Sequence, residues 1–125
     1  MKLNKMWDGL KRIANGDYVL EGDLIVEDSL EIELDDRLVV LGSIVVKKYI
    51  IAGCGIKAGE GIKAGWGIEA GWGIEAKTYI YSAKRIFAGL SLYHTSANCK
   101  KTITCTELRK GEICYGDLVI TGKSE

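Results

Sequence analysis

Hydrophobic residues recur every six positions over most of the chain. Every sixth residue from 20 to 92 is aliphatic: Leu20, Val26, Ile32, Leu38, Ile44, Ile50, Ile56, Ile62, Ile68, Ile74, Ile80, Ile86 and Leu92. A second apolar or small residue, most often alanine, follows two positions later at Leu34, Val40, Val46, Ala52, Ala58, Ala64, Ala70, Ala76 and Ala88. Apolar positions spaced by two are typical of a strand with one buried face. Each hexad therefore predicts a short strand followed by a corner.

The hexads predict an all-β protein that forms a single triangular β-helix. Residues 55–76 show the repeat most clearly, as GIKAGE, GIKAGW, GIEAGW and GIEA. Three sides of six residues give about 18 residues per coil, so residues 17–96 predict about four coils of a solenoid. Glycines fit the corners, where φ can be positive, at positions 53, 55, 59, 61, 65, 67, 71 and 73. A β-sandwich is the alternative, but sandwiches do not keep a strict six-residue frame over such a length.

The order of large and small residues bears on the direction of winding. The left-handed hexapeptide acyltransferases place a small residue two positions before the aliphatic one. In this chain the small residue follows the aliphatic one, as Ala64 follows Ile62. This order favours a right-handed helix like that of bactofilins.

The two ends of the chain differ from the hexads. Residues 1–16 place apolar side chains at helical spacing before a helix stop at Asn15-Gly16, namely Met6, Trp7, Leu10 and Ile13. This spacing predicts a helical cap over the first coil. Residues 97–125 alternate around Arg109-Lys110-Gly111 and predict a β-hairpin that caps or extends the last coil. All three segments belong to one domain.

Composition narrows the function classes. The chain has 125 residues, 17 Lys plus Arg against 17 Asp plus Glu, and a pI of about 6.6. Balanced charge argues against direct nucleic-acid binding by the whole surface. No apolar run is long enough to span a membrane, and no secretory signal is visible after the N-terminal lysines. We therefore expect a cytoplasmic protein.

Residues suited to catalysis or metal binding are few. The single histidine, His94, is the base that a hexapeptide-type acyltransferase would use at a subunit groove, and this is the strongest enzymatic alternative. The cysteines contain no C-x-x-C pair and are expected as small apolar fillers, at Cys54, Cys99, Cys105 and Cys114. The glycine-rich tract lacks the Gly-Lys-Ser/Thr ending of a phosphate-binding loop. We predict a non-enzymatic protein with no catalytic residue, no metal and no cofactor.

Acidic residues are concentrated in the first coil. Nine acids and no base lie between residues 17 and 36: Asp17, Glu21, Asp23, Glu27, Asp28, Glu31, Glu33, Asp35 and Asp36. One coil is one slice of the solenoid, so these residues predict a negative belt, with Glu21, Glu27 and Glu33 on different walls. Such a belt can imitate phosphate and dock on a basic groove. The alternative is a solvated end that only blocks edge pairing.

Aromatic residues supply the second candidate surface. Residues 18 apart stack on successive coils, so Trp66 falls between Lys48 and Lys84 in a possible cation–π ladder. Large aromatics are enriched in binding hot spots, and this chain places Trp66, Trp72, Tyr81, Phe87 and Tyr93 at corner or outward positions. We expect contact with a protein partner, or with a second copy in a lateral homodimer, and no membrane contact. The predicted partner-binding residues are these five aromatics together with Glu21, Asp23, Glu27, Asp28, Glu33, Asp35 and Asp36.

Two sequence segments carry a resemblance to known proteins. VLEGDLIVEDSLEIE at 19–33 and the glycine-rich tract at 55–76 resemble small β-helix proteins of phages and mobile elements of Gram-positive bacteria. This resemblance implies a stoichiometric inhibitor of host defence of the anti-CRISPR type. It also implies a CRISPR effector nuclease as the partner and the bacterial host cytoplasm as the location. A weaker similarity to bactofilins implies an alternative, a self-assembling structural scaffold.

Overall fold

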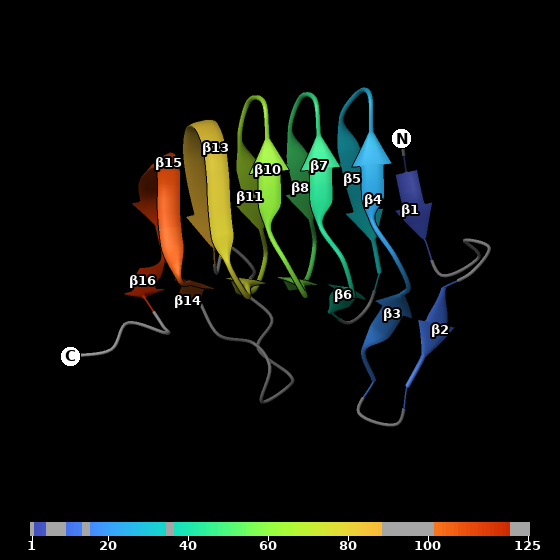
Figure 1. Ribbon diagram of the computed structural model, residues 1–125. Helices are drawn as coiled ribbons and strands as arrows, with labels where there is room; N and C mark the ends of the chain where they lie inside the picture. Colours follow the sequence, from blue (N-terminus) through green and yellow to red (C-terminus); the bar gives the residue numbers. More distant parts are fainter. Residues whose placement is uncertain (1, 5–9, 14–15, 35–36, 89–101, 121–125) are drawn as a thin grey trace.

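The computed structural model describes residues 2–4, 10–13, 16–34, 37–88 and 102–120. Every regular element in these ranges is a strand (Figure 1). The strands are β1 (Lys2–Asn4), β2 (Lys11–Arg12), β3 (Tyr18–Leu20), β4 (Leu24–Val26), β5 (Leu30–Glu33), β6 (Leu38–Val40), β7 (Ile44–Val46), β8 (Ile50–Ala52), β9 (Ile56–Ala58), β10 (Ile62–Ala64), β11 (Ile68–Ala70), β12 (Ile74–Ala76), β13 (Tyr79–Ala88), β14 (Thr102–Cys105), β15 (Glu107–Tyr115) and β16 (Asp117–Ile120).

The strands stack into three walls around one axis. Wall 1 consists of β3, β6, β9, β12, β14 and β16, with β2 at its edge. Wall 2 consists of β4, β7, β10 and the first half of β13, and wall 3 consists of β1, β5, β8, β11 and the second half of β13. From β3 to β16, the six stacked strands of wall 1 bound five turns. The predicted β-helix is therefore confirmed, with one turn more than the hexads alone indicated.

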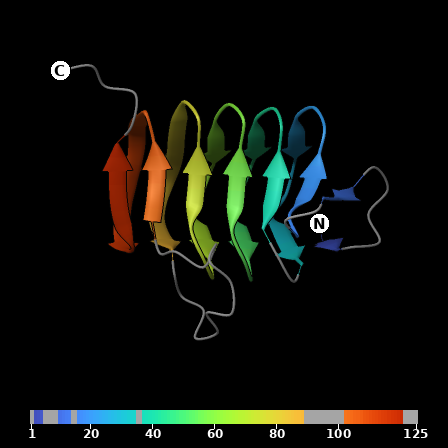
Figure 2. The same ribbon diagram turned by 90° about the horizontal axis from the view of Figure 1, so that it is seen from below.

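The solenoid is right-handed. In Figure 1 the chain rises through β4 in front, passes over the top to β5 behind, and returns along the bottom to β7. Successive turns advance from the blue end to the red end, and Figure 2 shows wall 1 from below with its strands running from back to front. These directions correspond to a right-handed screw, as the order of large and small residues predicted.

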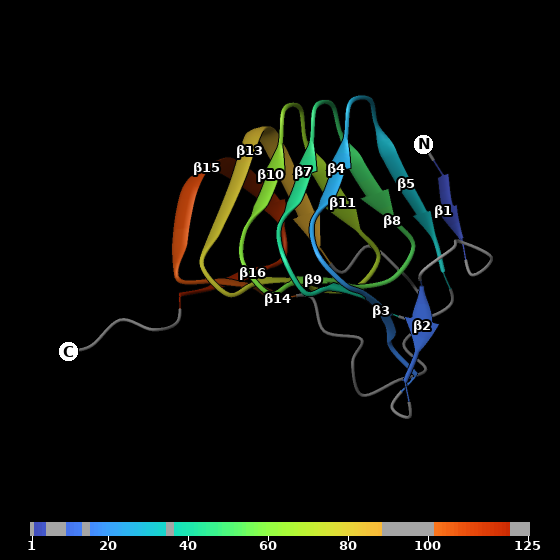
Figure 3. The same cartoon turned by 45° about the vertical axis from the view of Figure 1, so that its right-hand side comes forward.

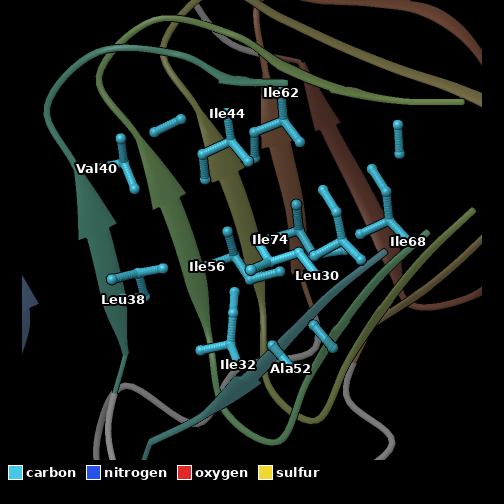
Figure 4. Close-up of a cluster of buried hydrophobic side chains, with 14 of the residues drawn as sticks. Leu30, Ile32, Leu38, Val40, Ile44, Ala52, Ile56, Ile62, Ile68 and Ile74 are labelled. Carbon is cyan, nitrogen blue, oxygen red and sulfur yellow. The ribbon is translucent and has the colours of Figure 1, made fainter. Parts of the chain in front are cut away.

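The inward positions form the core. In the middle coils the register is 18 residues, as in Ile44, Ile62 and Ile80 on wall 2. The isoleucines are at most 1% exposed from Ile44 to Ile86, and Figure 4 shows them converging from the three walls. Alanine occupies the second inward position, for example Ala64 and Ala70 at 0% exposure, where the walls leave little room. Burial of apolar surface is the main stabilising contribution, at about 25 cal/mol per Å².

The first coil is two residues longer than the others. Register pairs there lie 20 apart, as in Tyr18 with Leu38 and Leu24 with Ile44. The extra residues follow β5, so the strands before that point start two positions earlier than the six-residue frame predicts. The aliphatic row nevertheless looks unbroken, because positions i and i+2 of each strand both point inward. A two-residue shift therefore exchanges one inward position for the other.

A buried ion pair accompanies the longer coil. Asp17 is 2% exposed, and its carboxylate accepts hydrogen bonds from Arg37 Nη2 at 2.6 Å and Arg37 Nε at 3.2 Å. Removal of one partner from such a pair leaves a desolvated charge. Asp17 thus joins wall 1 to the return of the first coil and does not belong to the exposed acids.

The predicted helical cap at residues 1–16 is wrong in the parts that the structure describes. β1 pairs in parallel with β5, and β2 pairs antiparallel with β3. The first coil has unpaired strand edges, and an added strand satisfies their backbone groups where a helix laid across them would not. Leu3 is fully buried, and Ile13 is 47% exposed. Met6 and Trp7 lie outside the described residues.

The predicted C-terminal hairpin is also wrong, and the segment extends the solenoid instead. β14 pairs with β16 in parallel, and β15 follows both halves of β13 in parallel (Figure 3). Gly111 has a φ of +139°, a conformation that other residues rarely adopt, and the chain turns there from wall 2 to wall 3 rather than reversing. The register widens to 29 residues from Ile74 to Ile103 and narrows to 15 from Ile103 to Leu118.

Corner glycines are required by close rung spacing rather than by backbone conformation. Within the described residues, positive φ occurs at Gly16, Gly22, Gly111 and Gly116, and at none of the eight predicted corner glycines. A Cβ on Gly65 would instead overlap the carbonyl oxygen of Lys47 in the preceding coil. The corner sequence therefore limits how closely one coil lies on the next.

We predict that Gly65→Ala lowers the free energy of unfolding by about 1–3 kcal/mol, because the rungs must separate to admit the methyl group. Gly53→Ala is the matched control, since nothing lies within 4 Å of its added Cβ. Urea unfolding of both variants measures the difference. Equal midpoints would show that rung spacing does not require glycine at residue 65.

Candidate protein-binding surface

A groove of about 820 Å³ lies on wall 3, next to its corner with wall 2. It extends over β8, β11 and the second half of β13. Its lining combines apolar and aromatic side chains with charges of both signs: Tyr49, Ile50, Ile51, Trp66, Gly67, Ile68, Glu69, Ala83, Lys84, Arg85, Phe87 and Glu112. Shallow sites of this composition are typical of protein contact surfaces.

The floor of the groove follows from strand register. Ile51, Glu69 and Phe87 are register partners on three successive coils of wall 3. All three occupy the middle position of the strand, which points away from the core. Ile51 is 36% exposed, and Phe87 is partly exposed. The sequence predicted Phe87 as an outward aromatic, and the structure places it beside Ile51 and Glu69.

The rim of the groove is an interacting column at the corner. Trp66 is 46% exposed, and its ring centroid lies 5.9 Å from that of Tyr49. Lys48 Nζ lies 5.4 Å from the Trp66 ring centroid and 3.1 Å from Asp28 Oδ1. Asp28, Lys48 and Trp66 thus form a column over three coils. The predicted cation–π contact with Lys48 is present, while Lys84 lines the groove one coil further on.

A buried hydroxyl fixes the backbone beneath the rim. Ser82 stands in register with Ala64 and is 0% exposed. Its Oγ lies 3.3 Å from the carbonyl oxygen of Trp66 and 3.4 Å from that of Arg85, so its one proton is shared between two acceptors. Sequence analysis missed Ser82, Tyr49 and Arg85. Only the stacking of 49, 67 and 85 at intervals of 18 could have linked Tyr49 and Arg85 to Trp66.

Trp72, predicted as an exposed corner, is buried at 5% exposure. It belongs to the corner between walls 3 and 1, where Leu34 and Cys54 are also buried. Cys54 donates a hydrogen bond from Sγ to the carbonyl oxygen of Leu34 at 3.1 Å. This column is apolar at every coil, so it packs inward and Trp72 cannot serve as an exposed anchor.

The other predicted aromatics do not contribute to the groove. Tyr81 lies on wall 2, partly exposed, with Lys63 Nζ 5.5 Å from its ring centroid. Tyr93 lies outside the described residues. Of the predicted aromatics that the structure describes, only Trp66 and Phe87 line the groove.

The predicted acidic belt is present, but several of its members make internal contacts. Glu21, Glu27 and Glu33 are exposed and fall at the ends of three strands from different walls. Asp23 Oδ1 accepts the backbone N–H of Ser43 at 2.8 Å. Asp28 pairs with Lys48, and Asp35 and Asp36 lie outside the described residues. The belt is therefore less negative than nine free acids would make it.

Groups for catalysis or metal binding are sparse in the described ranges. No cluster of three or more His, Cys, Asp or Glu side chains there could hold a metal ion. Cys54 and Cys105 are buried, and desolvation by burial raises the pKa of the Cys105 thiol. Cys114 is exposed, while Cys99 and His94 lie outside these ranges. The same ranges hold no apolar helix long enough to cross a membrane.

Comparisons with known proteins add no identity: no family model, no curated protein and no solved structure matches the chain. The similarity to phage β-helix proteins and to bactofilins therefore stays a prediction from sequence.

We predict that Lys48→Met raises the pKa of Asp28. In the folded protein this pKa lies below its ordinary range, chiefly because Lys48 donates a hydrogen bond to the carboxylate. A depressed folded-state pKa means that the contact is present above the unfolded pKa and is lost as the pH falls through the folded value. An NMR titration of the Asp28 carboxyl carbon measures the shift. Lys84→Met is the control and should leave this pKa unchanged.

Proposed function

We propose that this chain is a non-enzymatic protein-binding solenoid whose main contact surface is the groove beside Trp66. The observation that carries the proposal is the exposure of Trp66 next to Tyr49, Ile51 and Phe87. Tryptophan and tyrosine dominate binding hot spots because they bury a large area at a small cost in conformational entropy. The rigid β-helix keeps these side chains aligned before a partner binds, which lowers the entropic cost of association.

The charges around the groove support a protein as its occupant. Lys84 and Arg85 lie at the β13 corner, and Glu69 and Glu112 lie further along the groove. Apolar side chains surrounded by charges of both signs resemble the core and rim of a protein interface. A small-molecule site would instead enclose most of its ligand.

The acidic belt supports a partner with a basic surface. Glu27 and Asp28 share the corner of Trp66 and lie two coils away from it, roughly 10 Å at the spacing of stacked strands. A partner that covers the groove would therefore also reach these acids. We propose a nucleic-acid-handling protein, such as a CRISPR effector nuclease, that is inhibited when its basic groove is occupied. The exposed acids and the sequence resemblance support this partner class.

Trp66→Ala should weaken binding to the partner by roughly 30-fold or more, the loss expected for a hot spot worth at least 2 kcal/mol. Affinity capture from a bacterial host lysate supplies the partner, and titration calorimetry with the purified partner measures the affinity. Leu41→Ala is the matched control, because Leu41 is 52% exposed and does not line the groove. Equal affinities of Trp66→Ala and the parent would refute the groove as the contact surface.

A Glu21→Gln, Glu27→Gln, Glu33→Gln variant should bind the same partner more weakly and with a smaller dependence on salt, because fewer charges are screened. Asp23 is kept, since its carboxylate holds the Ser43 backbone. Glu75→Gln is the control on wall 1, where Glu75 pairs with Lys57 at 3.4 Å. An unchanged salt dependence would leave the groove alone as the binding surface.

A further inference from the structure

The last described coil leaves core positions uncovered. Leu118 and Ile120 of β16 stack on Ile103 and Cys105 of β14. Ile103 and Cys105 are 0% exposed, whereas Leu118 is 41% and Ile120 is 37% exposed. Side chains in the same two inward columns thus change from buried to exposed in a single step. An apolar patch at the end of a solenoid is typical of a site that another surface covers.

The same end carries free strand edges. Among the described strands β16 pairs only with β14, and β15 pairs only with β13. The outer side of each strand therefore offers backbone N–H and C=O groups without a described strand partner. Leu108 and Ile113 of β15 are partly buried against the core and complete the apolar centre. Strand edges around an apolar centre favour pairing with another strand.

We propose that this end, made of β15 and β16, docks against the same end of a second copy. Its charges suit a contact with itself. Glu107 and Arg109 already pair at 2.7 Å, and the remaining charges are of both signs, at Lys110, Glu112 and Asp117. Two such ends can meet without a large excess of like charge.

The opposite end does not suit this contact. There β1 and β2 occupy the edges of walls 3 and 1. The exposed acids Glu21, Glu27 and Glu33 lie in the first coil, so two such ends would repel each other. Association therefore uses one end only and stops at two copies.

A three-walled rod permits a symmetric contact of this kind. A twofold axis through the middle of wall 1, perpendicular to the solenoid axis, maps wall 1 onto itself and exchanges walls 2 and 3. It places β16 antiparallel to β16 of the second copy, and the wall 2 half of β15 beside the wall 3 half of its counterpart. Closed twofold interfaces are the commonest form of homo-oligomer.

The contact area is small. The last turn has 15 residues between Ile103 and Leu118, below the roughly 20–30 residues that each partner contributes to a standard stable interface. We therefore expect a reversible dimer whose population rises with protein concentration.

Sedimentation velocity over a range of concentrations tests the proposal. The parent chain should show monomer and dimer and no larger species. A Leu118→Lys, Ile120→Lys variant should weaken dimerisation at least tenfold, and its circular dichroism at low concentration should match that of the parent, because both side chains are already exposed. Ile25→Lys is the matched control: Ile25 is 63% exposed in the first coil, and this variant should dimerise like the parent.

Several results would overturn the end contact. They are a parent that stays monomeric, growth beyond the dimer, undiminished dimerisation of the double variant, or loss of the dimer with Ile25→Lys. Hydrogen exchange gives an independent measurement, because β16 amides should gain protection with concentration while β4 amides should not. Trp66→Ala should leave the dimer intact, so failure of the end contact and failure of the proposed groove are distinguishable.

Discussion

Backbone hydrogen bonds between successive coils determine where every outward side chain lies. The N–H groups of Leu38, Ile44 and Ile50 each donate to a glycine carbonyl of the next coil at 2.9 Å. Because this ladder repeats on all three walls, the inward isoleucines stack and the outward residues form straight columns. The groove is one consequence, since it needs Ile51, Glu69 and Phe87 to stay aligned over three coils. Its rigidity comes from the core and not from contacts between the groove residues themselves.

The repeat predicts what is periodic and fails where the period changes. The hexads predicted the walls, the inward isoleucine and alanine positions and the 18-residue register of the middle coils. They did not reveal the two extra residues of the first coil, because Leu24 and Val26 are both suitable inward residues. They also did not reveal the strand ends. Helical spacing in residues 1–16 and alternation around Gly111 are local signals, whereas free strand edges of the adjacent coil determine what those segments form.

The candidate surface was predictable only in part, for a related reason. Adding 18 to a residue number identifies its neighbour on the next coil, which linked Lys48 to Trp66 correctly. The same arithmetic does not say whether a corner points outward or inward. Trp66 and Trp72 occupy equivalent places in the repeat, yet one is exposed and the other is buried. The difference comes from their columns, since Trp66 stacks on the charged Lys48 and Trp72 on the apolar Cys54.

The near-identical hexads of residues 55–76 have a consequence for how the gene can change length. Duplication of three hexads would add one full turn, about 4.8 Å of rod, and every column beyond it would keep its angular position. Duplication of one or two hexads would instead rotate everything downstream by a third or two thirds of a turn. Such a change would carry Phe87 away from Asp28 while the interior stayed well packed. Evolution can therefore rearrange the working face of this rod without disturbing its stability.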